Sequence, residues 1–231
     1  MTLNEIFQKL LDTYSYQGWW PITDYEGSNP TKTGSTQGYH PADYSFPRNS
    51  SERFEIIVGA VLTQNTSWPQ VEKSIINLKE LIDLTPFEIL ELGEDEFKSA
   101  IKPSGYFNQK YIYLRNISEF YISLEGRTPK RDDLLSVKGI GPETCDSILL
   151  YAYGEKEFVV DAYTRRIFSY LGLIDEKDSY NKIKKLFEDD FEGSAEDYQE
   201  YHALIVEHAK NFYVKKPYGY NDNVLNNFKV K

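Results

Sequence analysis

Apolar residues recur at intervals of three and four along most of the chain, which is the spacing of a helix face that packs against a core. At the N-terminus, Thr2 and Glu5 form a capping-box pattern ahead of Ile6 and Leu10. Further helices are predicted after Ser51, Ser67 and Thr85, and over about 108–123, 131–137, 142–153, 161–171, 180–191 and 195–212.

Strand patterns are scarce. The one β-like stretch is Phe158-Val159-Val160, which is too short to carry a sheet, and no two alternating runs are joined by a hairpin turn. The sequence therefore predicts an all-α fold. Residues 22–50 differ in kind, because they are rich in proline and glycine and show little periodicity, so they are predicted to form a long loop. Loops of this length are usually functional or disordered, and both interpretations stay open.

Composition narrows the class of protein. The 231 residues are 40% hydrophobic and 27% charged, which fits a globular protein of one large domain or two small lobes. Cys145 is the single cysteine, which excludes an intramolecular disulfide, a four-thiolate zinc site and a cysteine-ligated iron–sulfur cluster. No apolar run approaches the ~18 residues of a membrane span, and the N-terminus lacks signal-peptide features. We expect a cytoplasmic protein, nucleoid-associated in a prokaryote, that has no membrane partner.

The net charge of -10 argues mildly against a nucleic-acid partner. Binding depends on where the charges lie, however, and the basic residues are clustered. The clusters are Lys102 with Lys110, Lys130 with Arg131 and Lys138, and Arg165 with Arg166. Net charge therefore does not exclude DNA binding.

The most informative stretch joins two predicted helices through Lys138-Gly139-Ile140-Gly141, followed by Pro142. Glycines bring the backbone to the surface without a Cβ in the way, and proline suits a first helical turn. Amides at the start of the second helix can then receive an anion such as phosphate. A plain helix–turn–helix corner explains the same residues equally well.

Asp161 follows the short apolar run and precedes a helical stripe that includes Arg165 and Arg166. Aspartate is among the best N-cap residues, so a capping role alone explains its position. The functional interpretation draws on the combination of hairpin, intervening helix, apolar run, aspartate and basic helix.

That combination resembles the helix-hairpin-helix DNA glycosylase superfamily, the group of endonuclease III, over roughly 54–173. Lys138-Gly139-Ile140-Gly141 is similar to the family hairpin, and Val160-Asp161 to the segment with its catalytic aspartate. Residues 58–66 and 101–110 are similar to the family's glutamine-bearing and intercalating loops. The resemblance implies two helical lobes with a cleft between them. One would be continuous over 51–156, and the other would combine 1–50 with 157–231.

Two departures narrow the resemblance. Members that cleave the strand carry a lysine where this chain has Glu143, and a carboxylate cannot form a Schiff base. Many relatives also carry a four-cysteine cluster that one cysteine cannot supply. The chain therefore looks most like the cluster-free 3-methyladenine glycosylases, which implies a monofunctional enzyme that acts on alkylated purines in double-stranded DNA and requires no cofactor.

The resemblance also implies roles for single residues. Asp161 would stabilise the positive charge that develops on the sugar when an N-glycosidic bond breaks. Tyr106 would enter the gap left by the flipped nucleotide, and Gln64 would face the orphaned base, although Tyr106 also suits a core and Gln64 a helix end. The base pocket would comprise Trp19, Trp20, Pro21, Phe54, Glu143 and Lys210.

The hairpin carbonyls of Leu135, Val137 and Ile140 would hold a monovalent cation, as in relatives. His202 and His208 are six residues apart, a poor spacing for two ligands on one helix face, so we expect no metal there. Other functions stay open: removal of uracil or 8-oxoguanine, DNA binding without catalysis, or an unrelated helical protein-interaction domain. We expect a monomer.

Overall fold

The computed structural model describes residues 2–31 and 37–230. Within these ranges the fold is all-α, and the only strand-like pairing is an isolated bridge between Ser28 and Gln37. The α-helices are α1 (Leu3–Tyr14), α2 (Ser50–Leu62), α3 (Trp68–Lys79), α4 (Pro86–Glu91), α5 (Glu94–Ile101), α6 (Phe107–Ser123), α7 (Arg131–Leu135), α8 (Pro142–Tyr153), α9 (Ala162–Tyr170), α10 (Tyr180–Asp190) and α11 (Ala195–Phe212). Two short 3-10 helices are η1 (Lys102–Ser104) and η2 (Asn226–Phe228).

Local sequence signals account for many helix ends. The capping box of α1 is confirmed, since the Glu5 amide donates to Thr2 Oγ1 and the Thr2 amide to Glu5 Oε2. Gly154 ends α8 with a φ of 68°, a left-handed conformation that glycine adopts at little cost. Helix α2 begins one residue earlier than Ser51, because Asn49 caps it by accepting from the Glu52 amide.

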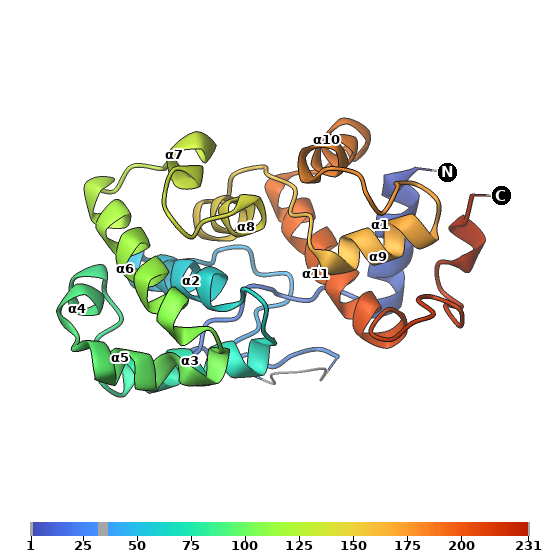
Figure 1. Ribbon diagram of the computed structural model, residues 1–231. Helices are drawn as coiled ribbons and strands as arrows, with labels where there is room; N and C mark the ends of the chain where they lie inside the picture. The colour runs from blue at the N-terminus through green and yellow to red at the C-terminus, as the bar shows by residue number, and fades with distance from the viewer. Residues whose placement is uncertain (1, 32–36, 231) are drawn as a thin grey trace.

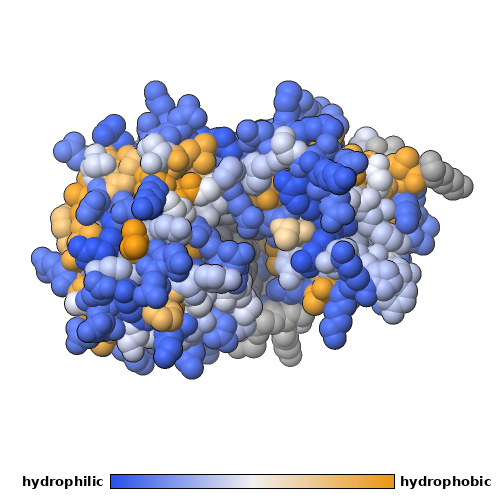
Figure 2. Space-filling model, viewed as in Figure 1, coloured by the Kyte–Doolittle hydropathy of each residue, from blue (hydrophilic) through white to orange (hydrophobic). Residues whose placement is uncertain are grey.

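The helices fall into two groups (Figure 1): α2 to α8 lie on one side, and α1 with α9, α10 and α11 on the other. Within the groups, α2 packs on α8, α4 on α6, and α11 on both α1 and α9. On the face shown in Figure 2 the surface is mostly hydrophilic and is hollowed between the two groups. The predicted division into 51–156 and 1–50 with 157–231 stays a proposal, because residues before α2 also bond to that helix and to α3.

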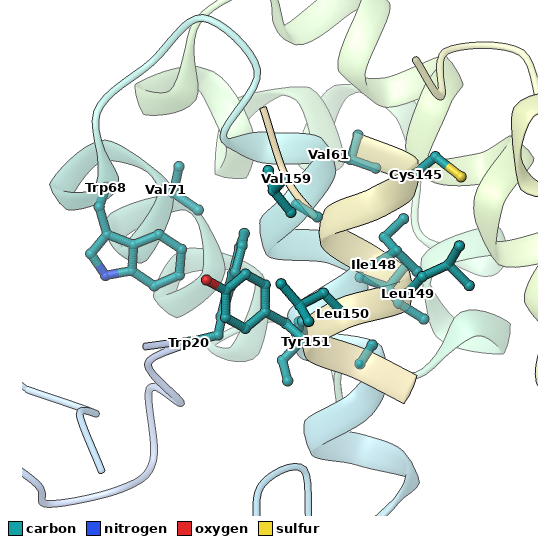
Figure 3. Close-up of a cluster of buried hydrophobic side chains, with 14 of the residues drawn as sticks. Trp20, Val61, Trp68, Val71, Cys145, Ile148, Leu149, Leu150, Tyr151 and Val159 are labelled. Carbon is teal, nitrogen blue, oxygen red and sulfur yellow. The ribbon is translucent and has the colours of Figure 1, made fainter. Parts of the chain in front are cut away.

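Figure 3 shows part of the core, in which side chains of α2, α3 and α8 meet Trp20 and Val159. Helix α2 is buried almost all round, and Gly59 lets the Trp20 ring approach so closely that an added Cβ would lie 3.0 Å from its Nε1. The Trp20 ring also packs on Trp68 and Tyr151, with ring centroids 5.4 and 5.3 Å away. Aromatic contacts of this kind fix the chain that leads into the cleft.

The predicted loop over 22–50 is irregular, as expected, and its described part is tied to the core. The Trp20 carbonyl lies 2.8 Å from His40 Nε2, and the Ile22 amide donates to the Gly38 carbonyl. Glu55, buried on α2, accepts from the Thr23 amide. These bonds favour an ordered role for the described residues, while 32–36 lie outside them.

Candidate active site

A cleft of about 750 Å³ lies between the first turns of α8 and α9, one face of α11 and the loop after α2. Its walls carry charged, aromatic and small polar side chains together. The lining includes Trp19, Trp20, Gln64, Trp68, Glu143, Thr144, Asp161, Tyr163, Arg166, His202, Val206 and Lys210. At least five segments far apart in the sequence therefore meet at one site: the tryptophan pair before α2, the loop after α2, and parts of α8, α9 and α11.

Asp161 performs the capping role and still faces the cleft. Its Oδ1 accepts from the Thr164 amide at 2.7 Å and from Thr164 Oγ1 at 2.8 Å, which fixes the carboxylate at the start of α9. Its Oδ2 lies 3.8 Å from His202 Nε2, and 14% of the Asp161 side chain is exposed. The two interpretations of the sequence are thus compatible, because one oxygen caps the helix and the other remains for chemistry.

Glu143 lies in the first turn of α8 and lines the same cleft. Desolvation, followed by the charge of Asp161, raises the pKa of Glu143 to about 7, although Arg165 opposes the shift. The residue is more than a third exposed at the rim, so water moderates this effect. Glu143 can therefore change its protonation state near neutral pH.

His202 is a cleft residue for which the sequence analysis assigned no role. Its ring on α11 is only 7% exposed, and its Nδ1 lies 2.8 Å from the Tyr151 hydroxyl. Among the described residues, Nε2 has no hydrogen-bond partner. Burial lowers the pKa of His202, while the charge of Asp161 acts the other way. The spacing of residues 202, 206 and 210 along one helix face is the signal that could have placed it in the cleft with Lys210.

The hairpin is held by the side chain of Gln64. Its Nε2 donates to the Gly139 carbonyl at 2.9 Å and to Thr144 Oγ1 at 3.0 Å. Gly139 has a φ of 101°, and an added Cβ would lie 2.2 Å from the Tyr113 ring, so no other residue fits. The structure thus gives Gln64 a structural role, and contact of this side chain with DNA stays a prediction.

The outer face of the hairpin is open. Lys138 is exposed, its carbonyl accepting from Asn116 Nδ2, and an added Cβ at Gly141 would meet no atom within 4 Å. Ile140 is buried and anchors the turn, and its amide donates to the Val137 carbonyl. The monovalent cation on the carbonyls of Leu135, Val137 and Ile140 stays a prediction.

Tyr106 projects from the loop before α6. It is 64% exposed, which removes the core interpretation, and it has a φ of 47°. Beneath it, the buried Lys110 donates from Nζ to the carbonyls of Leu62 and Ser104. Lys110 therefore does not belong to a surface cluster as its sequence suggested, since it joins the end of α2 to the Tyr106 loop. Desolvation lowers its pKa to about 8.

The six residues predicted for the base pocket divide into two sets. Trp19, Trp20, Glu143 and Lys210 line the cleft, whereas Pro21 and Phe54 are buried and do not. Phe54 packs on Tyr121 within the first group of helices, so we no longer include it in the proposed pocket. Trp68, which the sequence analysis did not single out, lines the cleft at a ring-centroid distance of 4.7 Å from Trp19.

The described residues show no cluster of three or more His, Cys, Asp and Glu side chains that could hold a metal ion. Cys145, the single cysteine of the chain, is buried in α8, so a four-cysteine iron–sulfur cluster has no ligand set here. None of the described helices has both the length and the apolar character needed to cross a membrane.

Comparisons with known proteins give the family of the chain. A family model for the HhH-GPD superfamily of base excision DNA repair proteins matches residues 58–192, more than half of the chain. A Methanocaldococcus jannaschii protein named as a candidate DNA repair glycosylase is 42% identical over 223 residues, which cover 92% of this chain and 89% of that protein.

Solved structures add the fold. The Helicobacter pylori 3-methyladenine DNA glycosylase MagIII, bound to 1,N6-ethenoadenine, is 31% identical with a TM-score of 0.61, covering 68% of this chain and 85% of that one. Endonuclease III in a non-covalent DNA complex is 17% identical with a TM-score of 0.70, covering 96% and 90%. The chain belongs to the HhH-GPD superfamily of base excision DNA repair proteins, in which it has an endonuclease III-like fold.

Proposed function

We propose that the protein is a monofunctional DNA glycosylase that flips an alkylated purine out of duplex DNA and hydrolyses its N-glycosidic bond, which initiates base excision repair. One observation carries the proposal: Asp161 is fixed through Oδ1 while its Oδ2 remains on the wall of an aromatic-lined cleft. A carboxylate held in this way suits a reaction whose transition state places positive charge on a sugar.

The proposed chemistry needs a dry and preorganised anion. Val160 and Thr164 beside Asp161 are buried, and the Asp161 side chain itself is 14% exposed. Electrostatic stabilisation is stronger in such a site than in water, and it requires no reorganisation during the reaction. Glu143 lines the cleft from the first turn of α8, at the position where strand-cleaving relatives have a lysine. Because a carboxylate cannot form the Schiff base that such a lysine forms, water would supply the oxygen that replaces the base.

Aromatic and acidic groups favour a cationic purine as the substrate. Trp19 and Trp68 offer flat faces at the cleft, and such faces attract cations. Ionised Glu143 would add a negative charge beside the bound base. The likeness to MagIII, whose structure holds 1,N6-ethenoadenine, supports a modified adenine as one substrate. Removal of uracil or 8-oxoguanine is the alternative.

Exposed features around the cleft suggest how the duplex is held. Helix α8 begins after Gly141, where the surface is open and Lys138 is exposed, so the first amides of this helix would receive a phosphate. Tyr106 projects far enough to fill the space left by an extruded nucleotide. We propose these roles for the hairpin and the tyrosine, with double-stranded DNA as the partner.

The test is a panel of duplexes, each carrying one modified base at the same position. Alkylated duplex and 1,N6-ethenoadenine duplex should release free base, whereas uracil and 8-oxoguanine duplexes should release at least about 10-fold less. Faster release of uracil or 8-oxoguanine would replace the proposed lesion class. Salt-sensitive binding without release of any base would indicate a non-catalytic DNA-binding protein.

A further inference from the structure

The contact between α11 and the start of α9 contains a histidine whose free nitrogen faces a carboxylate. His202 Nε2 lies 3.8 Å from Asp161 Oδ2, and the described residues offer Nε2 no hydrogen bond. The ring is 7% exposed, so water does not easily satisfy this nitrogen. Buried polar groups are nearly always paired, which makes an unpaired one beside a reactive carboxylate a candidate for function.

The hydrogen bonds around Nδ1 allow two tautomers. The Tyr151 hydroxyl has one hydrogen and two acceptors within reach, His202 Nδ1 at 2.8 Å and the Gln199 carbonyl at 3.1 Å. If the hydroxyl donates along the shorter contact to Nδ1, then Nε2 carries the ring hydrogen and points a donor at the Asp161 carboxylate; if it donates to Gln199, Nδ1 carries the hydrogen. The opposite tautomer would turn a lone pair toward a negative charge at 3.8 Å, which is electrostatically unfavourable.

A second arrangement in the same helix supports this assignment. His208, six residues further along α11, has Nδ1 2.9 Å from the Tyr14 hydroxyl and Nε2 2.9 Å from Asp222 Oδ2. These three residues have the same order of tyrosine, histidine and aspartate, and the carboxylate accepts from Nε2. At this distance Nε2 must donate, so the molecule already contains the tautomer that we assign to His202.

We propose that His202 is a positioning residue for base excision: its Nε2–H faces Asp161 Oδ2 and holds that carboxylate ionised and aimed at the sugar. The inference rests on the proposed glycosylase function and deepens it. Thr164 fixes one oxygen of Asp161, and His202 Nε2 faces the other at 3.8 Å, beyond hydrogen-bond distance. An N–H dipole that points at a carboxylate stabilises its negative charge, so removal of this dipole should make Asp161 easier to protonate.

Several charged or titratable groups face Asp161 or line its cleft, and the experiment must separate them from His202. They are Tyr39 before α2, Glu143 and Tyr151 from α8, Tyr163 and Arg166 from α9, and His202 and Lys210 from α11, with Arg165 acting on Glu143. Burial lowers the pKa of His202 and so favours its neutral ring. Substitutions of His202 leave the other groups in place, so a change in the acidic limb reports on this one contact.

Three substitutions of His202 separate the contribution of Nε2 from that of Nδ1. His202→Gln places an amide donor near the position of Nε2, and base release should stay within about 5-fold of the wild type. His202→Asn places its amide near Nδ1, which keeps a partner for Tyr151 and withdraws the donor from Asp161. His202→Phe removes both. For Asn and Phe we expect single-turnover base release at pH 7 to fall about 10- to 100-fold.

The decisive readout is the pH profile of single-turnover base release from a 1,N6-ethenoadenine duplex. The acidic limb should move to higher pH in His202→Asn and His202→Phe and stay in place in His202→Gln. A purely structural role would lower the rate without moving this limb. Affinity for undamaged duplex and the melting temperature, measured on each variant, identify any that is misfolded, and His202→Gln then supplies the comparison.

The possible failures are distinguishable. An active wild type with Asn and Gln variants of equal rate and equal pH profile would overturn the inference and leave the glycosylase proposal intact. A wild type that releases no base from any lesion duplex would overturn both. An inactive Asp161→Asn, measured beside the His202 variants, confirms that the assay follows the proposed chemistry.

Discussion

Helix α11 carries two arrangements of the same three residue types with different surroundings. In one, Asp222 accepts from His208, from the Tyr213 hydroxyl and from the amides of Val224 and Leu225, all at 2.8–2.9 Å. Its side chain and that of His208 are wholly buried. In the other, Asp161 is 3.8 Å from His202 and faces a cleft.

We interpret the difference as a division between a group that stabilises the fold and a group proposed to act in the reaction. The Asp222 arrangement joins α1, α11 and the C-terminal segment, and every oxygen is satisfied, as expected of a group that holds a fold together. Burial alone would raise the pKa of Asp222, but hydrogen bonds from His208 and its other donors lower it. The Asp161 arrangement leaves one oxygen and one nitrogen incompletely paired, as expected of a group that acts on a bound molecule.

The largest effect is expected for Asp161→Asn. Asparagine caps helices as well as aspartate does, so the melting temperature should stay within about 2 °C. The charge that stabilises the sugar is lost, and single-turnover base release should fall at least about 1000-fold. Equal rates for the variant and the wild type would remove Asp161 from the mechanism.

The matched substitution in the satisfied arrangement is Asp222→Asn. Both oxygens of Asp222 accept hydrogen bonds, so the amide nitrogen of asparagine would face donors wherever it lies. We therefore expect the free energy of unfolding, measured by urea denaturation, to fall by about 3 kcal/mol. Base release by the folded protein should stay within about 3-fold of the wild type. A loss of activity without a loss of stability would contradict the division of roles.

Glu143→Gln tests the second carboxyl of the cleft. Below pH 7 Glu143 is largely protonated, and above it the ionised form adds negative charge beside a cationic base. Wild-type release of an alkylated purine should therefore rise about 10-fold as pH increases through 7, and the variant should lack this step. A pH–rate profile with the same step in both proteins would assign the titration to another group.

The raised pKa of Glu143 also predicts a pH-dependent effect on stability. A carboxyl whose pKa is raised on folding stabilises the folded state at low pH, and this contribution is lost as pH rises through about 7. The melting temperature of Glu143→Gln should therefore exceed that of the wild type by more at pH 8.5 than at pH 5. Differential scanning calorimetry at both pH values provides the comparison, and an equal difference at both would contradict it.

The smallest effect on stability is expected for Tyr106→Gly. Glycine relieves the positive φ at this position but loses more entropy on folding, so the free energy of unfolding should change by no more than about 0.5 kcal/mol. Base release should fall about 10-fold because the exposed ring no longer fills the gap in the duplex. Tyr106→Ala, which keeps a Cβ, is the control, and wild-type rates in both variants would remove the intercalating role.

Local signals predicted much of the fold. The caps at Thr2 and Asp161, the glycine that ends α8 and the turn at Gly139 each depend on residues close in sequence, and all are present. Periodicity could not distinguish core from cleft on a helix buried all round, which is why Phe54 was assigned to the base pocket.

Long-range contacts account for what the sequence did not reveal. His202 contacts Tyr151 and lies near Asp161, and both are distant from it in the sequence. His208 likewise contacts Tyr14 and Asp222. No short sequence motif therefore marks either arrangement. The sequence placed Lys110 in a basic cluster. Its burial could not be predicted, because the two carbonyls that accept from it, those of Leu62 and Ser104, come together only in the folded chain.

The central claim is that water, directed by Asp161, breaks the glycosidic bond without a covalent protein–DNA intermediate. The most direct test incubates the wild type with a 1,N6-ethenoadenine duplex in two parallel samples. The sample without borohydride measures free base and strand breaks, and the sample with borohydride measures trapped complex. We predict free base with an intact strand that breaks only after alkali, and no trapped complex. Strand breaks that appear with the base, or a borohydride-trapped protein–DNA adduct, would contradict the account.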